Sequence, residues 1–345
     1  MKIKQTGIFF LLLFSYLSLF AQYTETINSN RPGFSQGAFS VGKQILQFEA
    51  GFGLGKEEHS LLNNETSAFI IDYEIRYGVW KEELEISLIG SYQSNSKTLL
   101  QSQSTYTERN FNANTLGAKY LFFDPYRKKA LEKPNLYSWK ANNGFHWKDL
   151  IPAMSIYAGA NFDQADNPLT HIPDTQLTLF NEEVETGMEI SPTVAIASQN
   201  NWGSWVFVIN IIGERLTLDE KSYSYILTLT HTFNAKLAAF IENQGIKSDF
   251  YADQLFRGGA TYLINKNFQI DASILLNFKD TPSRLYGRFG VSYRFDMHKK
   301  DEYIEDKGKA GREKKKKEKN STKKKTKNKK SKRKNNLDIE DDGLN

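Results

Sequence analysis

The chain contains no cysteine, so neither a disulfide nor a cysteine-bound metal can stabilise its fold. Histidine is scarce, with five residues, and no two of them have the His-x-x-x-His spacing of a helical metal site. After position 21 no apolar run is long enough for a helix that spans a bilayer. Between residues 42 and 296 no amphipathic helical stretch of useful length occurs either. These absences exclude a disulfide-stabilised domain and a helical membrane protein, and they leave β-strands as the main element.

The N-terminal residues are typical of a secretory signal peptide. Two lysines precede a 14-residue apolar run, Ile8 to Ala21, and the small residue Ala21 offers a cleavage position before Gln22. The run is too short for a spanning helix, and no cysteine follows it to carry a lipid anchor. The sequence therefore predicts a cleaved signal peptide over 1–21, with an uncleaved N-terminal anchor as the alternative.

The C-terminal residues from 297 to 345 differ in composition from the rest. From Lys299 onward they contain 19 Lys and Arg against 10 Asp and Glu, a net charge of +9, whereas the whole chain is +5. Residues 1–298 therefore carry −4, and the basic character belongs to the tail. With almost no apolar residue to bury, we expect this lysine-rich tail to be disordered.

The middle of the chain shows period-two alternation, over segments as long as a tilted strand needs to cross a bilayer. In 267–278, for example, Phe268, Ile270 and Ala272 share one face, while Gln269 and Asp271 lie on the other. The pattern predicts about twelve strands, at 43–54, 67–78, 82–93, 112–124, 152–163, 186–198, 203–213, 222–233, 236–244, 254–264, 267–278 and 284–296.

The connections between these segments alternate in length. If the chain starts on the periplasmic side, four of the five periplasmic connections have two to four residues, and the opposite set is longer in nearly every case. Short turns on one side and long loops on the other are typical of an outer-membrane barrel, and a soluble β-sandwich has no reason to show this parity. We therefore predict an all-β, antiparallel up-and-down membrane barrel over 43–296, with the sandwich as the alternative.

Aromatic residues and the end of the last strand support the membrane interpretation. Phe289, Val291, Tyr293 and Phe295 share one face of the last strand, similar to the C-terminal signal read by the outer-membrane assembly machinery. Tyrosine and tryptophan lie near predicted strand ends, where membrane barrels carry interfacial girdles. They are Tyr77, Trp80, Tyr92, Tyr120, Trp202, Trp205, Tyr223, Tyr225 and Tyr262.

Several segments resemble one known family. NRPGFSQGAFSVGKQILQFEAGF (30–52), KLAAFIENQG (236–245), GGATYLINKNFQIDASILLNF (258–278) and GVSYRF (290–295) are similar to the outer-membrane family named for the meta-pathway of phenol degradation, whose members are often called transporters. The matching positions are Asn30, Arg31, Pro32, Glu49, Glu242, Gln269, Ile270 and Asp271. The resemblance covers roughly 30–296 and implies an outer-membrane barrel, but the lysine tail departs from the family pattern and no substrate is carried over.

Charged residues on the inward face are the candidate functional residues. They are Glu49, Asp72, Glu74, Arg76, Glu83, Glu85, Lys119, Glu189, Glu242, Arg257, Asp271, Arg288 and Arg294. Because closure of a barrel places the last strand beside the first, we expect Arg288 and Arg294 to meet Glu49 and also Glu74. One interpretation is a constriction that selects solutes by charge and size, and the other is a set of ion pairs that fills a narrow interior.

The segment that precedes the first strand, residues 22–42, is irregular and rich in Gly, Pro, Ser and Asn. We predict a periplasmic leader, with Arg31 and Pro32 as its candidate functional residues and a cap over the periplasmic mouth as the hypothesis for Arg31. The connection at 125–151 breaks the rule of short periplasmic turns. Its basic and aromatic residues favour a position at the membrane surface, with a lumen plug as the alternative.

Enzymatic functions find little support. His231 is the only histidine within a predicted strand, it lacks a nearby serine partner, and an aromatic-girdle position suits it better. The glycines of GFGLG (51–55) share the inward face, and no helix follows them, so they are not a dinucleotide fingerprint.

The sequence as a whole predicts a passive outer-membrane channel or transporter for small solutes, hydrophobic or aromatic ones included. The alternative is a structural barrel with a sealed, salt-bridged lumen whose tail binds the cell wall or an acidic periplasmic protein. The expected partners are the lipid bilayer and the assembly machinery. For the tail, one hypothesis is binding to peptidoglycan or that acidic protein, and the alternative is a solvated extension that binds nothing. No cofactor, metal, catalytic residue or nucleic acid is expected.

Overall fold

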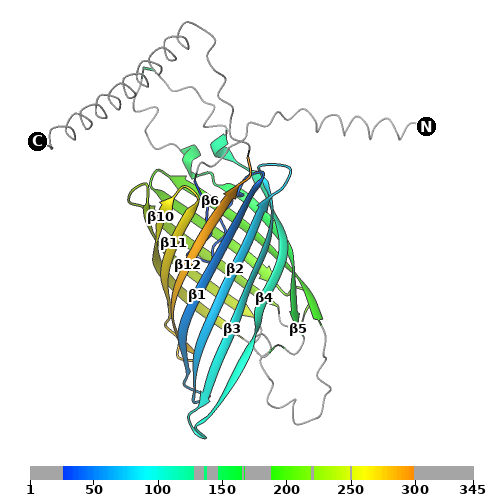
Figure 1. The fold of residues 1–345 in the computed structure, drawn as a ribbon, viewed down its shortest axis with the longest axis vertical. Helices are drawn as coiled ribbons and strands as arrows, with labels where there is room; N and C mark the ends of the chain where they lie inside the picture. Colours follow the sequence, from blue (N-terminus) through cyan, green and yellow to red (C-terminus); the bar gives the residue numbers. More distant parts are fainter. Residues whose placement is uncertain are drawn as a thin grey trace, which may run out of the picture. The chain divides into compact units, whose positions relative to one another are not determined.

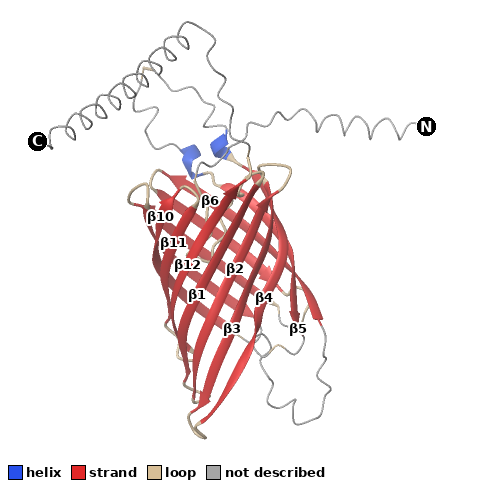
Figure 2. Ribbon diagram, in the orientation of Figure 1, coloured by secondary structure: helices blue, strands red, loops and turns tan. Residues whose placement is uncertain are grey.

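A computed structural model describes residues 26–127, 136–137, 147–164, 167, 188–218, 221–248 and 251–298. Twelve strands fill this part of the chain (Figures 1 and 2). They are β1 (Ile45–His59), β2 (Asn64–Gly78), β3 (Leu84–Leu99), β4 (Ser104–Phe123), β5 (Ala153–Gln164), β6 (Met188–Trp202), β7 (Trp205–Glu214), β8 (Ser222–Thr232), β9 (Leu237–Ser248), β10 (Ala252–Asn265), β11 (Phe268–Asn277) and β12 (Ser283–Asp296). Each predicted strand is confirmed, with its ends shifted by a few residues or, in β4, by more.

The strands form one closed antiparallel barrel in which every strand pairs with its neighbours in sequence. The first and last strands close it, with pairing from Ile45 opposite Asp296 to Glu58 opposite Ser283. Closure leaves no unpaired sheet edge along this seam. The predicted fold class is confirmed.

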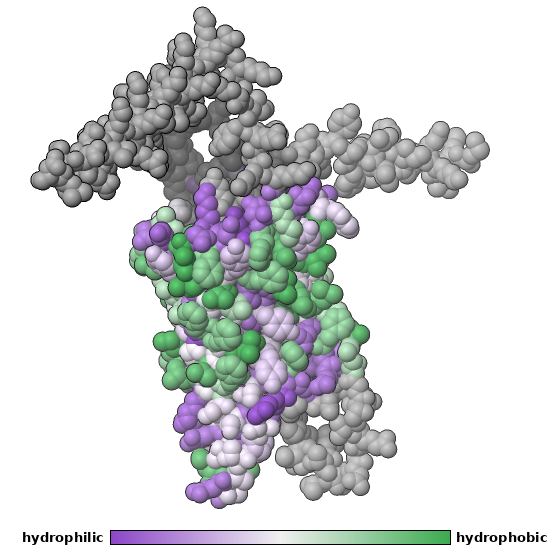
Figure 3. All heavy atoms as spheres, in the orientation of Figure 1, coloured by the Kyte–Doolittle hydropathy of each residue, from purple (hydrophilic) through white to green (hydrophobic). Residues whose placement is uncertain are grey.

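The wall carries its apolar side chains on the outside and its charged side chains on the inside, which is the reverse of a soluble protein. Large apolar side chains such as Phe52, Leu116 and Ile241 are exposed on the outside, while inward Arg76, Lys119 and Glu85 are almost completely buried. In Figure 3 an apolar band covers the strands, between polar residues at the end where β1 begins and a largely polar tip at the other end. This arrangement is the one that a lipid bilayer imposes on a barrel. Within the described residues, no helix has the length and apolarity that crossing a membrane requires.

We call the end at which β1 begins and β12 ends the periplasmic end, because short turns and both barrel termini belong there. At the other end the expected long loops at 55–66 and 94–111 are wrong: β1 and β2 are joined at 60–63, and β3 and β4 at 100–103. Both hairpins continue as strands past the apolar band (Figures 1 and 3). The sequence pattern missed this because strands with water on both faces need no apolar alternation.

Some predictions fall outside the described residues. They are the signal peptide, residues 22–25 of the leader, most of the connection between β4 and β5, and the lysine-rich tail from Lys299.

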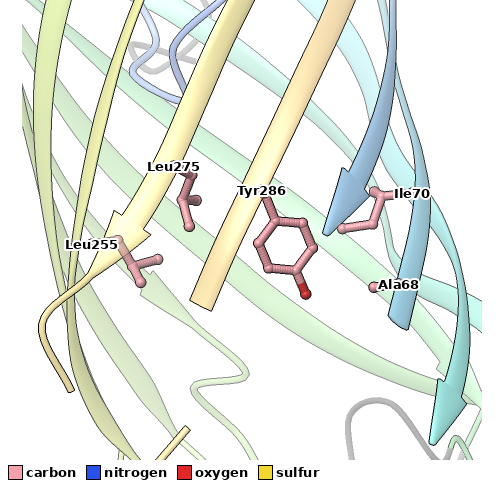
Figure 4. Packing of buried hydrophobic residues seen from close by; sticks show 5 residues of the cluster. All are labelled: Ala68, Ile70, Leu255, Leu275 and Tyr286. Atoms are coloured by element: carbon pink, nitrogen blue, oxygen red, sulfur yellow. The ribbon is translucent and has the colours of Figure 1, made fainter. Parts of the chain in front are cut away.

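One side of the interior near the extracellular end is filled by apolar side chains. Ala68, Ile70, Leu255, Leu275 and Tyr286 are each at most 5% exposed and pack together, with their side chains turned into the barrel (Figure 4). They come from β2, β10, β11 and β12, so this cluster braces the seam at which the barrel closes.

Candidate functional site

The described part of the leader, residues 26–42, lies inside the barrel and not in the periplasm. It begins near the periplasmic end of β11 and β12, where the N–H of Ile27 donates to Lys266 O (2.8 Å) and Arg294 Nη1 donates to Thr26 O (3.0 Å). It then bonds to inward side chains of β1, β2, β11, β9, β7, β6, β4 and β3 before it joins β1. The leader thus crosses the lumen as a plug that contacts most of the wall.

Glu49 is the first wall residue that holds this plug. Its carboxylate accepts hydrogen bonds from Ser29 Oγ (2.7 Å), from Arg31 N (3.2 Å) and from Gln47 Nε2 (2.6 Å). Arg76 Nη1 lies 3.4 Å from the same carboxylate. A buried carboxylate with so many donors is well satisfied, because hydrogen bonds to charged groups are the strong ones. This inward glutamate of β1 therefore anchors the leader.

Glu242 is the second wall carboxylate that accepts hydrogen bonds from the leader. It accepts the N–H of Phe34 (3.0 Å) and the N–H of Ser35 (3.2 Å), while Arg257 Nη1 donates to it at 2.8 Å. The Phe34 ring lies against two guanidinium groups, at 4.2 Å from Arg257 and 4.6 Å from Arg288. Cation–π contacts of this kind add to the hold on the backbone.

Neutral amides hold the next part of the leader. Asn210 accepts from Gln36 N (2.6 Å) and donates to Gln36 O (2.8 Å), so that one side chain satisfies both backbone groups of one residue. Gln199 Oε1 accepts from Ala38 N at 3.0 Å. These contacts are made to the backbone of the leader, so they depend little on which side chains it carries.

A buried charge cluster receives the end of the leader. Lys119 Nζ donates to Gly37 O (2.9 Å) and Phe39 O (3.1 Å), and Glu85 accepts from Val41 N (2.8 Å). Lys119 and Arg76 both pair with Glu85, at 2.8 and 3.1 Å. The charges of this cluster are thus compensated by one another and by the leader.

Arg31 lies in a notch that two facing glycines leave in the wall. Gly51 of β1 and Gly290 of β12 are direct cross-strand partners, and a Cβ atom at either would collide with the Arg31 guanidinium. Asp271 holds the same guanidinium through Nε and Nη2, both at 3.2 Å. The hypothesis that Arg31 caps the periplasmic mouth is wrong, because its side chain lies at Gly51, the seventh residue of β1, inside the lumen.

The other inward glycines of GFGLG leave room as expected. The side chain of Arg288 lies over Gly53, and the ring of Tyr286 lies over Gly55. Three glycines of one strand thus receive three large side chains from the leader and from β12, which explains why β1 tolerates glycine there.

The predicted pairing of the closing-strand arginines is wrong. Arg288 pairs with Asp72, and Arg294 bonds to Asn267 Oδ1 (3.1 Å) and to the leader. In the observed register Glu49 faces Ser292 and Gln47 faces Arg294, so neither arginine is opposite Glu49. Glu74 instead accepts from Asn30 Nδ2 at 2.9 Å.

The candidate residues within strands lie on the inner face of the wall. The pairs formed are Arg31–Asp271, Arg76–Glu49, Arg76–Glu74, Arg76–Glu85, Lys119–Glu85, Arg257–Glu242 and Arg288–Asp72. Glu83 differs, because it lies in the β2–β3 turn, where it pairs with Arg127 at 2.7 Å. Pro32 lies within the plug, and Glu189 is the second residue of β6.

A cavity of about 450 Å³ remains between the leader and the wall. Its lining includes Asn30, Arg31, Phe34 and Gln36 from the leader. The wall contributes a mixture of aliphatic, hydroxyl and amide side chains, with Ile89, Ser91, Thr115, Asn161, Thr193, Ala195, Asn210, Ile212, Ser224, Ile226, Gln244 and Ile246 among them. Charged groups on this surface, such as Asp72 and Arg215, form ion pairs with Arg288 and Asp163.

The uncharged wall side chains that hold the leader were not identified from the sequence. Asn210, Gln199, Thr228 and Gln47 all bond to the leader or to the carboxylates that hold it. Their signal was present, because an amide or hydroxyl on the inward face of an alternating strand needs a partner as much as a charge does.

Metal chemistry and histidine chemistry find no site in the described ranges. There, no group of three or more His, Cys, Asp or Glu residues is placed to hold a metal ion. His231 packs its ring between Trp205 (4.2 Å) and Phe233 (4.8 Å), as expected of a girdle residue.

The two ends of the connection between β4 and β5 are described, and they lie at the periplasmic end. Tyr126 packs on Phe39 of the leader at 6.0 Å, and its hydroxyl accepts from Asn201 N at 2.7 Å. The short helix η2 (Trp147–Leu150) contacts β6, where Trp202 Nε1 donates to Asp149 O at 2.7 Å. These ends thus join the leader to the strand ends of β6.

Comparison with solved structures finds membrane barrels at low identity. An outer membrane channel from Pseudomonas putida F1 is 8% identical, with 78% of this chain and 100% of that chain covered and a TM-score of 0.47. The translocator domain of the autotransporter NalP from Neisseria meningitidis is 9% identical (77% and 90% covered, TM-score 0.42). A deletion mutant of the monoaromatic hydrocarbon channel TodX is also 9% identical (79% and 96% covered, TM-score 0.41).

No curated protein sequence matches the chain. A family sequence model does match, over residues 29–295, which include the leader from Ser29 and almost the whole barrel. Its span coincides with the plug and the wall that holds it. The chain belongs to the family described as "Putative MetA-pathway of phenol degradation".

Proposed function

We propose that the protein is a passive outer-membrane channel for small solutes, in which the leader is a removable plug. One observation carries the proposal: a lumen with a cavity of about 450 Å³ is blocked by a segment that belongs to none of the twelve strands. A barrel that served only as a scaffold could fill the same space with side chains from its own strands.

The way in which the leader is held supports its removal. Among the described residues, its backbone bonds to the backbone of the wall lie at Ile27, near its start, and at Gln44, just after its end. Between them it is held by side chains such as Glu49, Asn210 and Glu242. Each of these bonds is exchangeable for a bond to water, so the leader can leave without breaking the β-ladder of the barrel.

The cavity favours small neutral solutes that have an apolar part. Ile212, Ile226 and Ile246 alternate with Asn210, Ser224 and Gln244 on three neighbouring strands, and Phe34 adds an aromatic surface. Asp72 and Arg215 in the lining are held in ion pairs, so these two groups offer little to a charged solute. Hydrophobic or aromatic solutes with a hydroxyl group suit this mixture, and membership in a family named for phenol degradation agrees with it.

The second candidate is a structural barrel that never opens. The apolar cluster around Tyr286 and the compensated charges around Glu85 favour it, because both fill the interior with packed or ion-paired side chains. The two functions differ in what removal of the leader does.

Deletion of residues 26–41 tests the proposal. In planar bilayers we expect the deletion to raise the mean conductance at least about tenfold over wild type, and the wild type itself to open in brief steps. Liposomes that carry wild-type protein should swell in a small neutral sugar such as arabinose, faster than protein-free liposomes. A folded deletion variant, checked by its heat-dependent shift on gels, that conducts no better than wild type would establish the sealed barrel.

The location and the tail are also proposals. We place the protein in the outer membrane of a Gram-negative bacterium after removal of residues 1–21, without an enzymatic role. The tail 297–345 would bind peptidoglycan or an acidic periplasmic protein through its lysines, and such binding must weaken with salt.

A further inference from the structure

The lipid-facing wall carries a groove of about 730 Å³, separate from the lumen. It lies across β7 to β11 and is almost entirely apolar. Its outward residues are Phe207, Leu227, Leu229, Ile241, Asn243, Phe256, Gly258, Ile274 and Leu276. The volume is within the range of about 300 to 1,000 Å³ that small-molecule sites have.

Missing side chains produce the groove. Gly258 of β10 lies directly between Ile241 of β9 and Ile274 of β11, and a Cβ atom on it would meet nothing closer than a carbonyl at 3.8 Å. One step toward the periplasmic end, Ala260 lies between Ala239 and Ala272. The floor is therefore a trough along β10 over Gly258 and Ala260, with the isoleucines beside Gly258 as its sides.

The extracellular end of the trough is closed, and at the periplasmic end the exposed Tyr262, paired with Leu237 and Ile270, lies between Ala260 and a basic rim. Phe256 packs against Phe278 at 5.2 Å and blocks the extracellular end. At the other end Lys236 lies in the β8–β9 turn, where its carbonyl accepts from Leu263 N of β10 at 2.7 Å. Lys236 is exposed, and Lys266 lies in the adjacent β10–β11 turn.

We propose that this groove binds a membrane phospholipid of the periplasmic leaflet, with one acyl chain in the trough over Gly258 and Ala260 and the phosphate at Lys236. The apolar band leaves lipid as the substance in contact with this wall, and the cation lies at the end where a headgroup would be. An acyl chain fills an elongated apolar trough without leaving polar groups unsatisfied, whereas a polar solute would.

The groove also lies back to back with the leader. Glu242 and Arg257, whose side chains hold the leader from inside, belong to the two strands that form the floor and one side of the groove. Lipid and plug thus bind opposite faces of β9 and β10. The proposal does not depend on the channel function, because the groove faces the membrane whether or not the lumen opens.

Binding of phosphatidylglycerol to the full-length protein in detergent, followed by native mass spectrometry, tests the site. Gly258→Leu fills the trough, and Ala260→Leu fills it one step further along. Gly287→Leu is the matched control, because Gly287 also pairs with Ile274 and also has free space for a side chain, but lies outside the groove. Lys236→Ala removes the phosphate contact, and Lys247→Ala removes a lysine at the other end of the same strand.

We expect Gly258→Leu and Ala260→Leu each to weaken binding of the first phosphatidylglycerol about tenfold, and Lys236→Ala about fivefold. Both control variants should bind as wild type does. Unchanged binding in folded Gly258→Leu and Ala260→Leu would overturn the proposal, as would equal losses in Lys236→Ala and Lys247→Ala. Loss of a dimer in Gly258→Leu, seen by light scattering, would assign the groove to a second copy of the chain and also overturn it.

Discussion

The periplasmic and extracellular halves of the lumen are filled in different ways. In the periplasmic half the leader occupies the space, and wall side chains such as Glu49, Asn210 and Glu242 bond to its backbone. In the extracellular half the strands themselves supply Ile70, Leu275 and Tyr286, which pack without any guest segment.

The difference shows which part of the interior can change. Apolar packing is lost only by opening a cavity. The cost in unfolding free energy is about 2 to 5 kcal/mol for each large side chain. Backbone bonds to polar side chains can be replaced by water at a net cost of about 1 kcal/mol each. A segment held by bonds from polar side chains to its backbone is suited to reversible displacement. Apolar packing is suited to permanent support of the seam between β1 and β12.

The substitution Glu242→Ala should have the largest effect of those considered, in the half of the lumen that the leader fills. It leaves Arg257 buried without its partner, which costs about 3 to 5 kcal/mol of unfolding free energy, and it removes the acceptor for Phe34 and Ser35 N–H. We therefore expect a loss of stability together with a several-fold rise in single-channel conductance. Guanidinium unfolding from lipid vesicles and planar-bilayer recording measure the two effects.

Glu242→Gln separates the two roles of this residue. It keeps an acceptor for the leader but removes the charge that Arg257 faces, so stability should fall while conductance stays near that of wild type. If Glu242→Ala is folded and its conductance is unchanged, Glu242 does not hold the plug.

Tyr286→Ala should affect the other half of the comparison. Tyr286 is 4% exposed and its ring fills the space over Gly55, so truncation costs about 3 kcal/mol through the cavity that it leaves. Conductance should change less than twofold, because the leader is untouched. Tyr286→Phe keeps the ring and loses only the 2.5 Å bond to Glu57, at about 1 kcal/mol. A large conductance in Tyr286→Ala would mean that the cluster, too, controls opening.

Lys56→Ala should give the smallest effect. Lys56 pairs with Glu58 (2.7 Å) and Glu65 (3.2 Å), but all three side chains are about half exposed, at the extracellular end. Exposed pairs are screened by solvent, so neither the unfolding transition nor the conductance should change measurably. A clear loss of stability would show that the hairpin beyond the membrane contributes to the barrel.

The barrel could be predicted from the sequence because its signal is repeated. Each strand places residues such as Phe48 on one face and Glu49 on the other, and a closed barrel with lipid outside and polar groups inside satisfies both faces of twelve such strands. The family match over 29–295 agrees with this fold.

The partners of the inward residues could not be predicted in the same way. Alternation puts Glu49 and Arg294 on the inner face, but the register places Ser292 opposite Glu49. Shifting the register of a closed barrel changes every such pair, and the alternation pattern is the same at each shift of two residues.

The sequence by itself determined the number of strands, their inward and outward faces, the polar lumen and the irregular character of the leader. Only the tertiary structure decided that the leader folds back into the lumen and that Arg31 enters the notch between Gly51 and Gly290. The physical reason is that strand faces follow from local alternation, whereas the space that receives the leader exists only once β1 and β12 have closed the barrel.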